Sequence, residues 1–280
     1  YFGGNRVFIE GIPDDDTKPE FIRYIDDNED ILPLKHQIDH NLNELPSSLN
    51  EALRAFLVAR SIRNLRGQAD KHASMLVNAS RFTRVQGLLR TRLHEVLDNI
   101  QNSLRVNGAT GDAADRDPEI AALKKIWKDE FSYSGFDWSD VRAALYTAVA
   151  SAKVVEVNSA RNDLDYSSSG KKGVTVIAVG GFSLSRGLTL EGLTTTWFLR
   201  NTMMYDTLMQ MGRWFGYRMG YDDLCRIWMP RGAVSWYAHI ADATEELHHE
   251  LGLMEEAKAT PKQFGLAVKS HPSALMVTAR

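Results

Sequence analysis

Short apolar runs alternate along the chain with longer stretches in which apolar residues recur every three or four positions. The short runs predict buried β-strands at Arg6–Ile12, Ser74–Asn78, Ala152–Asn158, the beginning of Val174–Leu193, Thr194–Leu199 and Leu224–Met229. The helical spacing predicts α-helices at 47–67, Thr83–Leu104, Ile120–Phe131, the stretch after Asp137 or Ser139, and Asp242–Ala257. Strands that alternate with helices are typical of an α/β protein, so we predict a parallel sheet flanked by helices.

The first predicted helix has a basic face. Ser47 or Ser48 is suited to cap its start. Its outward side carries the four arginines Arg54, Arg60, Arg63 and Arg66. Such a stripe faces either solvent or the phosphates of a nucleic acid, and the pattern fits both interpretations.

The segment after Ser74–Asn78 is a candidate binding loop. A strand, a polar loop and a helix form the repeating step of a parallel sheet, whose functional loops lie at the carboxyl ends of the strands. The loop contains two hydroxyl and two guanidinium groups, from Ser80, Arg81, Thr83 and Arg84. These groups suit a sugar-phosphate backbone. Thr83 is also suited to cap the following helix, and both roles are compatible.

The most distinctive stretch is QMGRWFGYR, from Gln210 to Arg218. We interpret it as a helix that carries Arg213 and Arg218, and two arginines near one helix end beside a glycine-rich loop indicate a phosphate-sensing site. The aromatic residues either stack on bases or belong to the core, and these are Trp214, Phe215, Tyr217 and Tyr221. The P-loop pattern GxxxxGK followed by Ser or Thr does not occur, so this chain cannot hold ATP in the usual way.

Composition limits the other possibilities. A chain of 280 residues with 44% hydrophobic and 25% charged residues is ordinary for a globular protein. A net charge of -3 means that nucleic-acid affinity requires a local basic patch. The single cysteine, Cys225, excludes an internal disulfide and a cysteine zinc cluster, and it favours a reducing, cytoplasmic setting. No apolar run is long enough to cross a membrane, so we expect no membrane partner.

Acidic residues gather near the N-terminus, at Asp14, Asp15, Asp16, Glu20, Asp26, Asp27, Glu29 and Asp30. Such a run is typical of a solvated loop, and a carboxylate metal site is the alternative. Tyr1 is not an initiator methionine, and the closing run Ala274–Arg280 alternates like a strand without a following turn. We therefore expect the chain to be part of a longer polypeptide.

The order of these motifs resembles the second RecA-like lobe of superfamily 2 helicases and translocases. MLVNASR resembles a loop that contacts the nucleic-acid backbone, SRGLTLEG resembles a motif of the type xRGxDxP, and QMGRWFGYR resembles Q-x-x-G-R-x-x-R. The resemblance implies that Arg213 and Arg218 are arginine fingers. It places Gly187, Thr189, Gln210 and Gly212 at the nucleotide cleft, and Ser185 and Arg186 at the nucleic acid.

Three departures from that pattern affect these assignments. Two residues separate Gln210 from Arg213 where the family has three, and Arg218 lies five residues after Arg213 rather than three. Thr189 stands where the family usually has aspartate. Arg213 is thus the first candidate for a finger, and Arg218 is the second.

The amino-acid sequences of several segments resemble one domain family more specifically. HASMLVNASR, SRGLTLEGLTTTWFLRN, YDTLMQMGRWFGYRMGYDDLCRIWMP and ALMVTAR are similar to the Z-one (Z1) domain, a proposed endonuclease domain joined to superfamily 2 helicase domains. The resemblance spans most of the chain and implies a prokaryotic, helicase-linked protein of DNA restriction or defence. It identifies no catalytic site for cleavage.

We accordingly expect a lobe that binds DNA and completes an ATP cleft. ATP and Mg²⁺ would be held mainly by an N-terminal helicase lobe of the same polypeptide, so the isolated chain would be inactive as an ATPase. A metal-dependent endonuclease, with carboxylates from the acidic loop, Glu191, Asp222 and Asp223, and a non-catalytic DNA-binding or assembly scaffold are the alternatives.

We divide the chain into three parts on the same basis. Residues 1–70 would form an N-terminal extension with a helix. Residues 71–230 would form the RecA-like lobe with an insertion near 106–138, and residues 231–280 a C-terminal extension.

Overall fold

The structure, a computed structural model, describes residues 2–14, 17–157, 164, 166, 173–181, 189–199 and 205–258. Within these residues six parallel strands form one sheet in the order β1-β6-β5-β2-β4-β3. The strands are β1 (Ile22–Tyr24), β2 (Ala73–Asn78), β3 (Lys153–Val157), β4 (Thr175–Gly180), β5 (Leu193–Phe198) and β6 (Arg226–Met229). The predicted α/β class with a parallel sheet is confirmed, and the arrangement is consistent with a RecA-like core.

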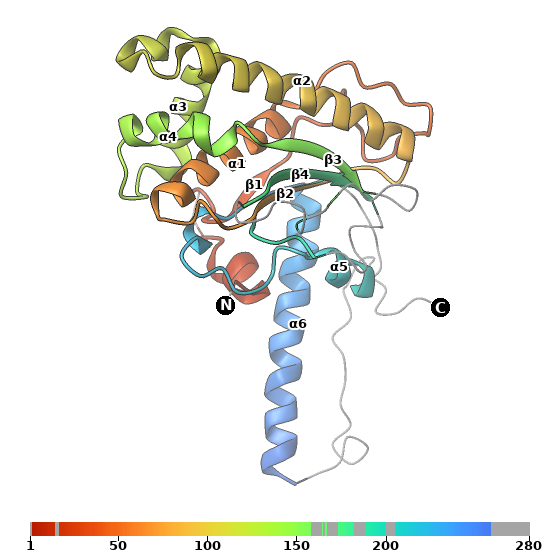
Figure 1. Ribbon diagram of the computed structural model, residues 1–280. Coiled ribbons are helices and arrows are strands. Elements are labelled where there is room, and N and C mark those ends of the chain that lie inside the picture. The colour runs from red at the N-terminus through yellow and green to blue at the C-terminus, as the bar shows by residue number, and fades with distance from the viewer. Residues whose placement is uncertain are drawn as a thin grey trace.

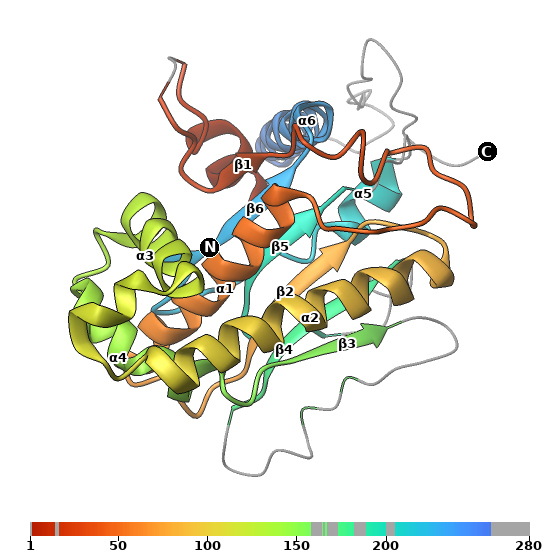
Figure 2. The same cartoon turned by 90° about the horizontal axis from the view of Figure 1, so that it is seen from above.

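Helices cover both faces of this sheet (Figures 1 and 2). One face carries α1 (Ser47–Leu65), α2 (Thr83–Asn107), α3 (Pro118–Phe131) and α4 (Trp138–Val149). The other face carries the π-helix η1 (Arg6–Glu10), α5 (Tyr205–Met211) and α6 (Arg231–Glu256). The described residues also form two short 3-10 helices, η2 (Gly111–Arg116) and η5 (Asp222–Leu224).

Alternate strand residues enter two separate cores. In β2, Met75 and Val77 pack toward α1 and α2, whereas Leu76 points to the opposite core beside α6. Successive side chains of a strand point to opposite faces, and both faces are covered here. This arrangement explains why the strands appear in the sequence as continuous apolar runs.

The predicted strand Arg6–Ile12 is wrong, because residues Arg6–Glu10 form η1. Val7 and Phe8 are both buried in the core beside α6, where the Phe8 ring stacks on Tyr237 with 5.1 Å between ring centroids. A strand would send these neighbouring side chains to opposite faces, whereas a helical turn turns both inward.

The interpretation of QMGRWFGYR as a helix is wrong as well. The helix α5 ends at Met211, and the arginines follow it in an irregular segment. Gly216 has φ 137°, a conformation that favours glycine, and it pairs with Phe2 through two backbone hydrogen bonds. This segment must return across the sheet because the parallel strand β6 begins at the opposite edge from the end of β5.

The start of α1 is stabilised by a residue from the acidic N-terminal segment. Ser47 and Ser48 are the first helical residues rather than caps, and the Asp27 carboxylate accepts hydrogen bonds from the Ser48 amide and hydroxyl at 2.8 and 2.6 Å. A carboxylate at a helix N-terminus compensates amides that lack helical partners.

The predicted domain limits stay predictions, although β1 and β6, which they separate, are neighbours in one sheet.

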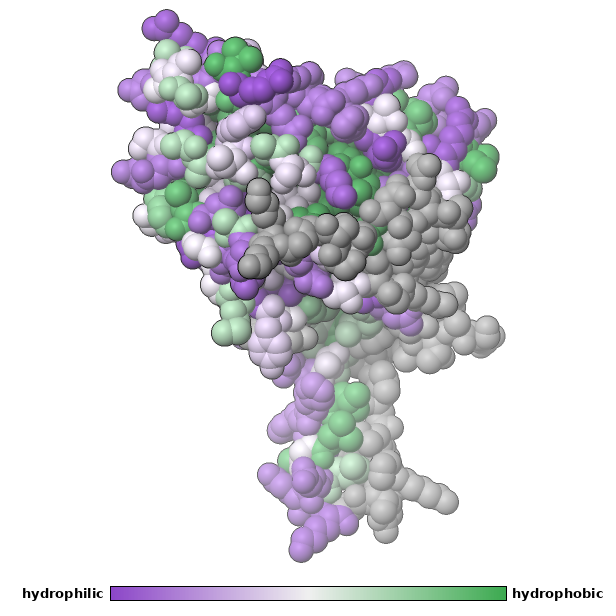
Figure 3. All heavy atoms as spheres, viewed as in Figure 1, coloured by the Kyte–Doolittle hydropathy of each residue, from purple (hydrophilic) through white to green (hydrophobic). Residues whose placement is uncertain are grey.

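The helix α6 begins at Arg231, earlier than the predicted 242, and extends from the body of the protein (Figure 1). Its first half packs under the sheet through Tyr237 and Ile240, while Leu251 and Leu253 farther along are exposed. Figure 3 shows hydrophobic side chains at the surface of the protruding part of the molecule. No helix in the described part of the chain is long and apolar enough to span a membrane.

Candidate nucleic-acid interface

The predicted binding loop lies at the carboxyl edge of the sheet. Strand β2 ends at Asn78, and the chain continues through Ser80 and Arg81 to the start of α2 at Thr83. Arg81, Thr83 and Arg84 are exposed, whereas Ser80 is only 1% exposed. The four predicted residues therefore lie together, and they differ in exposure, since Ser80 is buried and the other three face solvent.

Ser80 holds a histidine from the N-terminal segment. The His36 Nδ1 atom lies 2.7 Å from the Pro33 carbonyl, which can only accept, so Nδ1 carries the hydrogen. In the neutral ring Nε2 then accepts from the Ser80 hydroxyl, at 2.7 Å. The same hydroxyl oxygen accepts from the Phe82 amide at 3.1 Å. These bonds fasten the N-terminal segment to the β2–α2 loop.

A cavity of about 290 Å³ opens beside this junction. Its lining comes from both segments and consists of Leu34, Lys35, His36, Gln37, Ala79, Arg81 and Phe82. The Arg81 guanidinium carbon lies 4.7 Å from the centre of the Phe82 ring, so the ring restricts the position of the cation. Lys35 and Arg81, one from each segment, thus contribute two positive charges to the lining of one small cavity.

The N-terminus of α2 adds partial positive charge at the same edge. Phe82 occupies the capping position and its own side chain makes no capping hydrogen bond, so Thr83, the first helical residue, is not the predicted cap. First-turn amides that lack a helical partner attract anions. Arg84 donates to the Asn41 Oδ1 atom at 2.9 Å, which joins the exposed start of α2 to the N-terminal segment.

Sequence reasoning missed Lys35, His36 and Gln37. Their segment has no periodic pattern, and it reaches the loop only because the chain folds back after β1. His36 and Ser80 are 44 residues apart. A histidine and a lysine in an irregular stretch offer no local signal that could have placed them at this cavity.

The arginines of the stretch 210–218 differ in their surroundings. The Arg218 guanidinium donates to four carbonyl oxygens of its own segment, at distances of 3.1 to 3.4 Å, from Arg213, Trp214, Phe215 and Tyr217. Arg213 is half-buried. Arg218 consequently holds the turn that follows Arg213.

Arg218 also lies at the opposite edge of the sheet from Ser80. It neighbours Tyr221 and Cys225, and Cys225 directly precedes the first residue of β6. Burial raises the pKa of the Cys225 thiol to about 12, so this lone cysteine is not a reactive thiolate. The structure thus does not bring Arg218 together with the binding loop.

The remaining predicted cleft residues are distributed as follows. Gln210 is exposed near the end of α5, Thr189 is exposed before β5, and Gly212 is buried. A Cβ atom at Gly212 would lie 2.7 Å from the Phe215 ring, so the close ring requires glycine. Ser185, Arg186 and Gly187 lie outside the described residues, as does the closing run 274–280.

The two aspartates considered for metal binding form ion pairs. The Asp222 carboxylate lies 2.9 Å from Arg6, and Asp223 receives two hydrogen bonds of 2.7 Å from Arg66. Within the described part of the chain no three His, Cys, Asp or Glu side chains are grouped to hold a metal ion. No observation here favours the endonuclease alternative.

The fold and this edge define an α/β protein with a parallel sheet and a cationic cavity at its carboxyl edge. The chain belongs to the Z1 domain family, whose model matches residues 48–275, which is most of its length. No curated protein and no solved structure matches it. The resemblance to the Z1 domain is therefore confirmed, while the helicase-lobe assignment stays a proposal.

Proposed function

We propose that this Z1 domain binds the phosphodiester backbone of DNA at the carboxyl edge of its sheet. The observation that carries the proposal is the cavity between Lys35 and Arg81. Both side chains belong to segments that the His36–Ser80 hydrogen bond holds together. Lysine and arginine side chains and helix N-terminal amides are the groups that proteins commonly direct to phosphate oxygens.

The local charge supports this assignment despite the acidic chain. The net charge is -3, so a nucleic acid requires a site where cations are grouped. Lys35, Arg81 and Arg84 supply such a group, and none of them forms one of the ion pairs found among the described residues. Among the described residues, no ion pair neutralises their charges.

The finer part of the proposal concerns ATP. In a longer, helicase-linked polypeptide of DNA restriction or defence, Arg213 would approach the phosphates of ATP and Mg²⁺ held by another lobe. Arg218 would position the segment, because its guanidinium is bonded to carbonyl oxygens of the residues from Arg213 to Tyr217. The domain would then couple DNA at one edge of the sheet to the cleft.

Salt-dependent binding of fluorescent single-stranded and double-stranded DNA tests the backbone assignment. We expect Lys35→Ala and Arg81→Ala each to weaken binding to every sequence, and each to reduce the salt slope by about one. Lys128→Ala on α3 is the matched control, since Lys128 is exposed and does not line the cavity. Unchanged affinity in both cavity variants, or the same loss in the control, would refute the site.

A further inference from the structure

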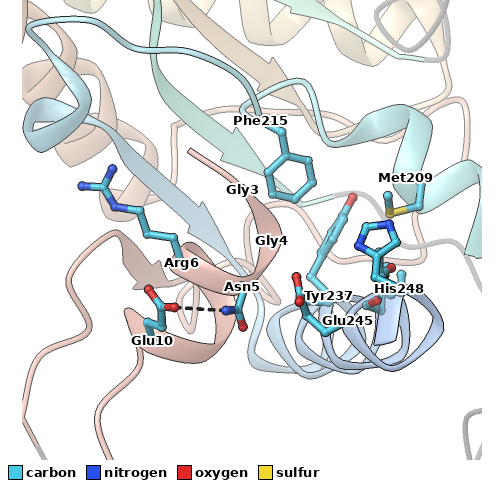
Figure 4. Close-up of a pocket in the computed structure, with 13 residues that line it drawn as sticks. Gly3, Gly4, Asn5, Arg6, Glu10, Met209, Phe215, Tyr237, Glu245 and His248 are labelled. Carbon is cyan, nitrogen blue, oxygen red and sulfur yellow. Dashed lines mark hydrogen bonds between the residues drawn. The ribbon is translucent and has the colours of Figure 1, made fainter. Parts of the chain in front are cut away.

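A larger groove lies on the other face of the sheet, between η1, the end of α5 and the first half of α6 (Figure 4). It measures about 560 Å³. The residues that line it are Gly3, Gly4, Asn5, Arg6, Glu10, Met209, Phe215, Tyr237, Ile240, Ala241, Thr244, Glu245 and His248. Cavities of about 300–1,000 Å³ are the size in which proteins bind ligands.

The floor of this groove is a fixed aromatic and aliphatic surface. Tyr237 stacks on Phe8 and contacts Phe215 edge-on, with ring centroids 5.1 and 6.5 Å apart. Gly4 allows η1 to approach α6 closely, since a Cβ atom there would lie 3.2 Å from the Ala241 Cβ. The groove is therefore built by packing between elements.

Most polar groups along the groove are already bonded within the protein. The Tyr237 hydroxyl donates to the Leu208 carbonyl at 2.7 Å, and the Thr244 hydroxyl donates to the Ile240 carbonyl at 2.7 Å. The Asn5 amide donates to Glu10 at 3.0 Å. A small polar ligand would thus find few directional partners here.

The charge that remains at the groove is negative. Arg6 is paired with Asp222 at 2.9 Å, and Figure 4 shows its guanidinium directed away from the aromatic floor. Glu10 comes from η1 and Glu245 from α6, both line the groove (Figure 4), and no hydrogen bond or ion pair is found for Glu245 among the described residues. An apolar floor beneath two carboxylates complements a cation on an apolar stem.

We infer that this groove docks a peptide segment of a protein partner that places an arginine or lysine beside an apolar side chain. The apolar residue and the methylene stem would cover Phe215 and Ile240, and the cation would lie between Glu10 and Glu245. This inference does not rest on the proposed DNA function, because the groove is on the opposite face from the Lys35–Arg81 cavity.

The test uses the whole chain and the peptide acetyl-Leu-Arg-Phe-amide. Binding is followed by NMR of methyl-labelled methionines. Met209 lines the groove, whereas Met219 is 85% exposed outside it and serves as the internal control. A peptide with citrulline in place of arginine keeps the shape and removes the charge.

We expect saturable shifts of the Met209 methyl signal with the arginine peptide and at least about three-fold weaker binding of the citrulline peptide. Glu245→Lys should weaken the arginine peptide about ten-fold by reversing one charge. Glu255→Lys, an exposed change farther along α6, is the matched control and should have little effect. No saturable shift, equal binding of both peptides, or equal losses in the two variants would overturn the inference.

Discussion

At the amino edge of the sheet, arginine side chains are buried and bonded within the protein, whereas at the carboxyl edge they lie exposed beside a cavity. Arg60 donates to the carbonyls of Gln68, Ala69 and Lys71 just before β2. Arg63 donates to the Gly192 carbonyl before β5. These hydrogen bonds hold the loops from which the strands start.

The strongest case is Arg226, the first residue of β6. It donates to the Glu130 carboxylate at 2.9 Å, and Arg23 of β1 forms an ion pair with the same carboxylate. Glu130 is 7% exposed and Arg226 is 3% exposed. At the carboxyl edge, by contrast, Arg81 contacts one aromatic ring and is exposed. Arginine residues are thus bonded within the protein at one edge and exposed at the other.

Among the variants that test this contrast, the one that removes the charge of Glu130 should lose the most stability. Glu130→Gln leaves Arg23 and Arg226 buried without their carboxylate, so we expect the free energy of unfolding to fall by about 3–5 kcal/mol. Urea denaturation measures it. Glu119→Gln on the same helix is the control. Glu119 and its ion-pair partner Arg54 are only partly buried, so the loss of free energy of unfolding should stay within about 1 kcal/mol. Similar losses in both variants would contradict the contrast.

The same residue predicts a dependence of stability on pH. Burial alone would raise the pKa of Glu130, but the Arg23 hydrogen bond and charge and the Lys18 and Arg226 contacts outweigh it and lower the pKa from 4.5 to about 2. The stabilisation is complete above the unfolded value of 4.5 and is lost as the pH falls toward 2. Between pH 4.5 and about 2 the free energy of unfolding of the wild type should fall by about 3 kcal/mol more than that of Glu130→Gln. If the two proteins lose stability in parallel as the pH falls, Glu130 is not the source of the pH dependence.

Arg218 and Arg213 provide the next test, because they are close in sequence and differ in surroundings. Arg218→Ala leaves four carbonyls without their donor, so we expect the free energy of unfolding to fall by about 1–3 kcal/mol. Arg213→Ala should instead abolish DNA-stimulated ATP hydrolysis in the proposed longer polypeptide. Wild-type turnover of Arg213→Ala would refute the finger assignment.

Ser80→Ala should have the smallest effect on stability. It removes the hydrogen bonds to His36 and Phe82, so we expect a loss of about 1 kcal/mol and weaker DNA binding through a displaced Arg81. Since the Arg81 charge is kept but displaced, the salt slope of DNA binding should fall by less than in Arg81→Ala. Wild-type affinity of Ser80→Ala for DNA would refute the positioning role of Ser80.

Patterns along the sequence predicted five of the six strands in the described residues, most helices and the loop after β2, while β1 was missed. Buried parallel strands appear as apolar runs, and helices such as α2 carry their periodicity locally, so Ser80, Arg81, Thr83 and Arg84 could be placed at the carboxyl end of a strand. The same local reasoning failed for η1 and for the segment after α5. There, packing on Tyr237 and the pairing of Gly216 with Phe2 decided the backbone.

The role of each arginine was decided only by the tertiary structure. The basic stripe of α1 was expected to face solvent or phosphate, yet Arg60 and Arg63 are buried, and Arg66 pairs with Asp223, which is 157 residues away. Likewise, His36 reaches Ser80 across 44 residues. A guanidinium group looks the same in every sequence window, and whether it binds a carbonyl, a carboxylate or a ligand depends on groups that only folding brings within hydrogen-bonding distance.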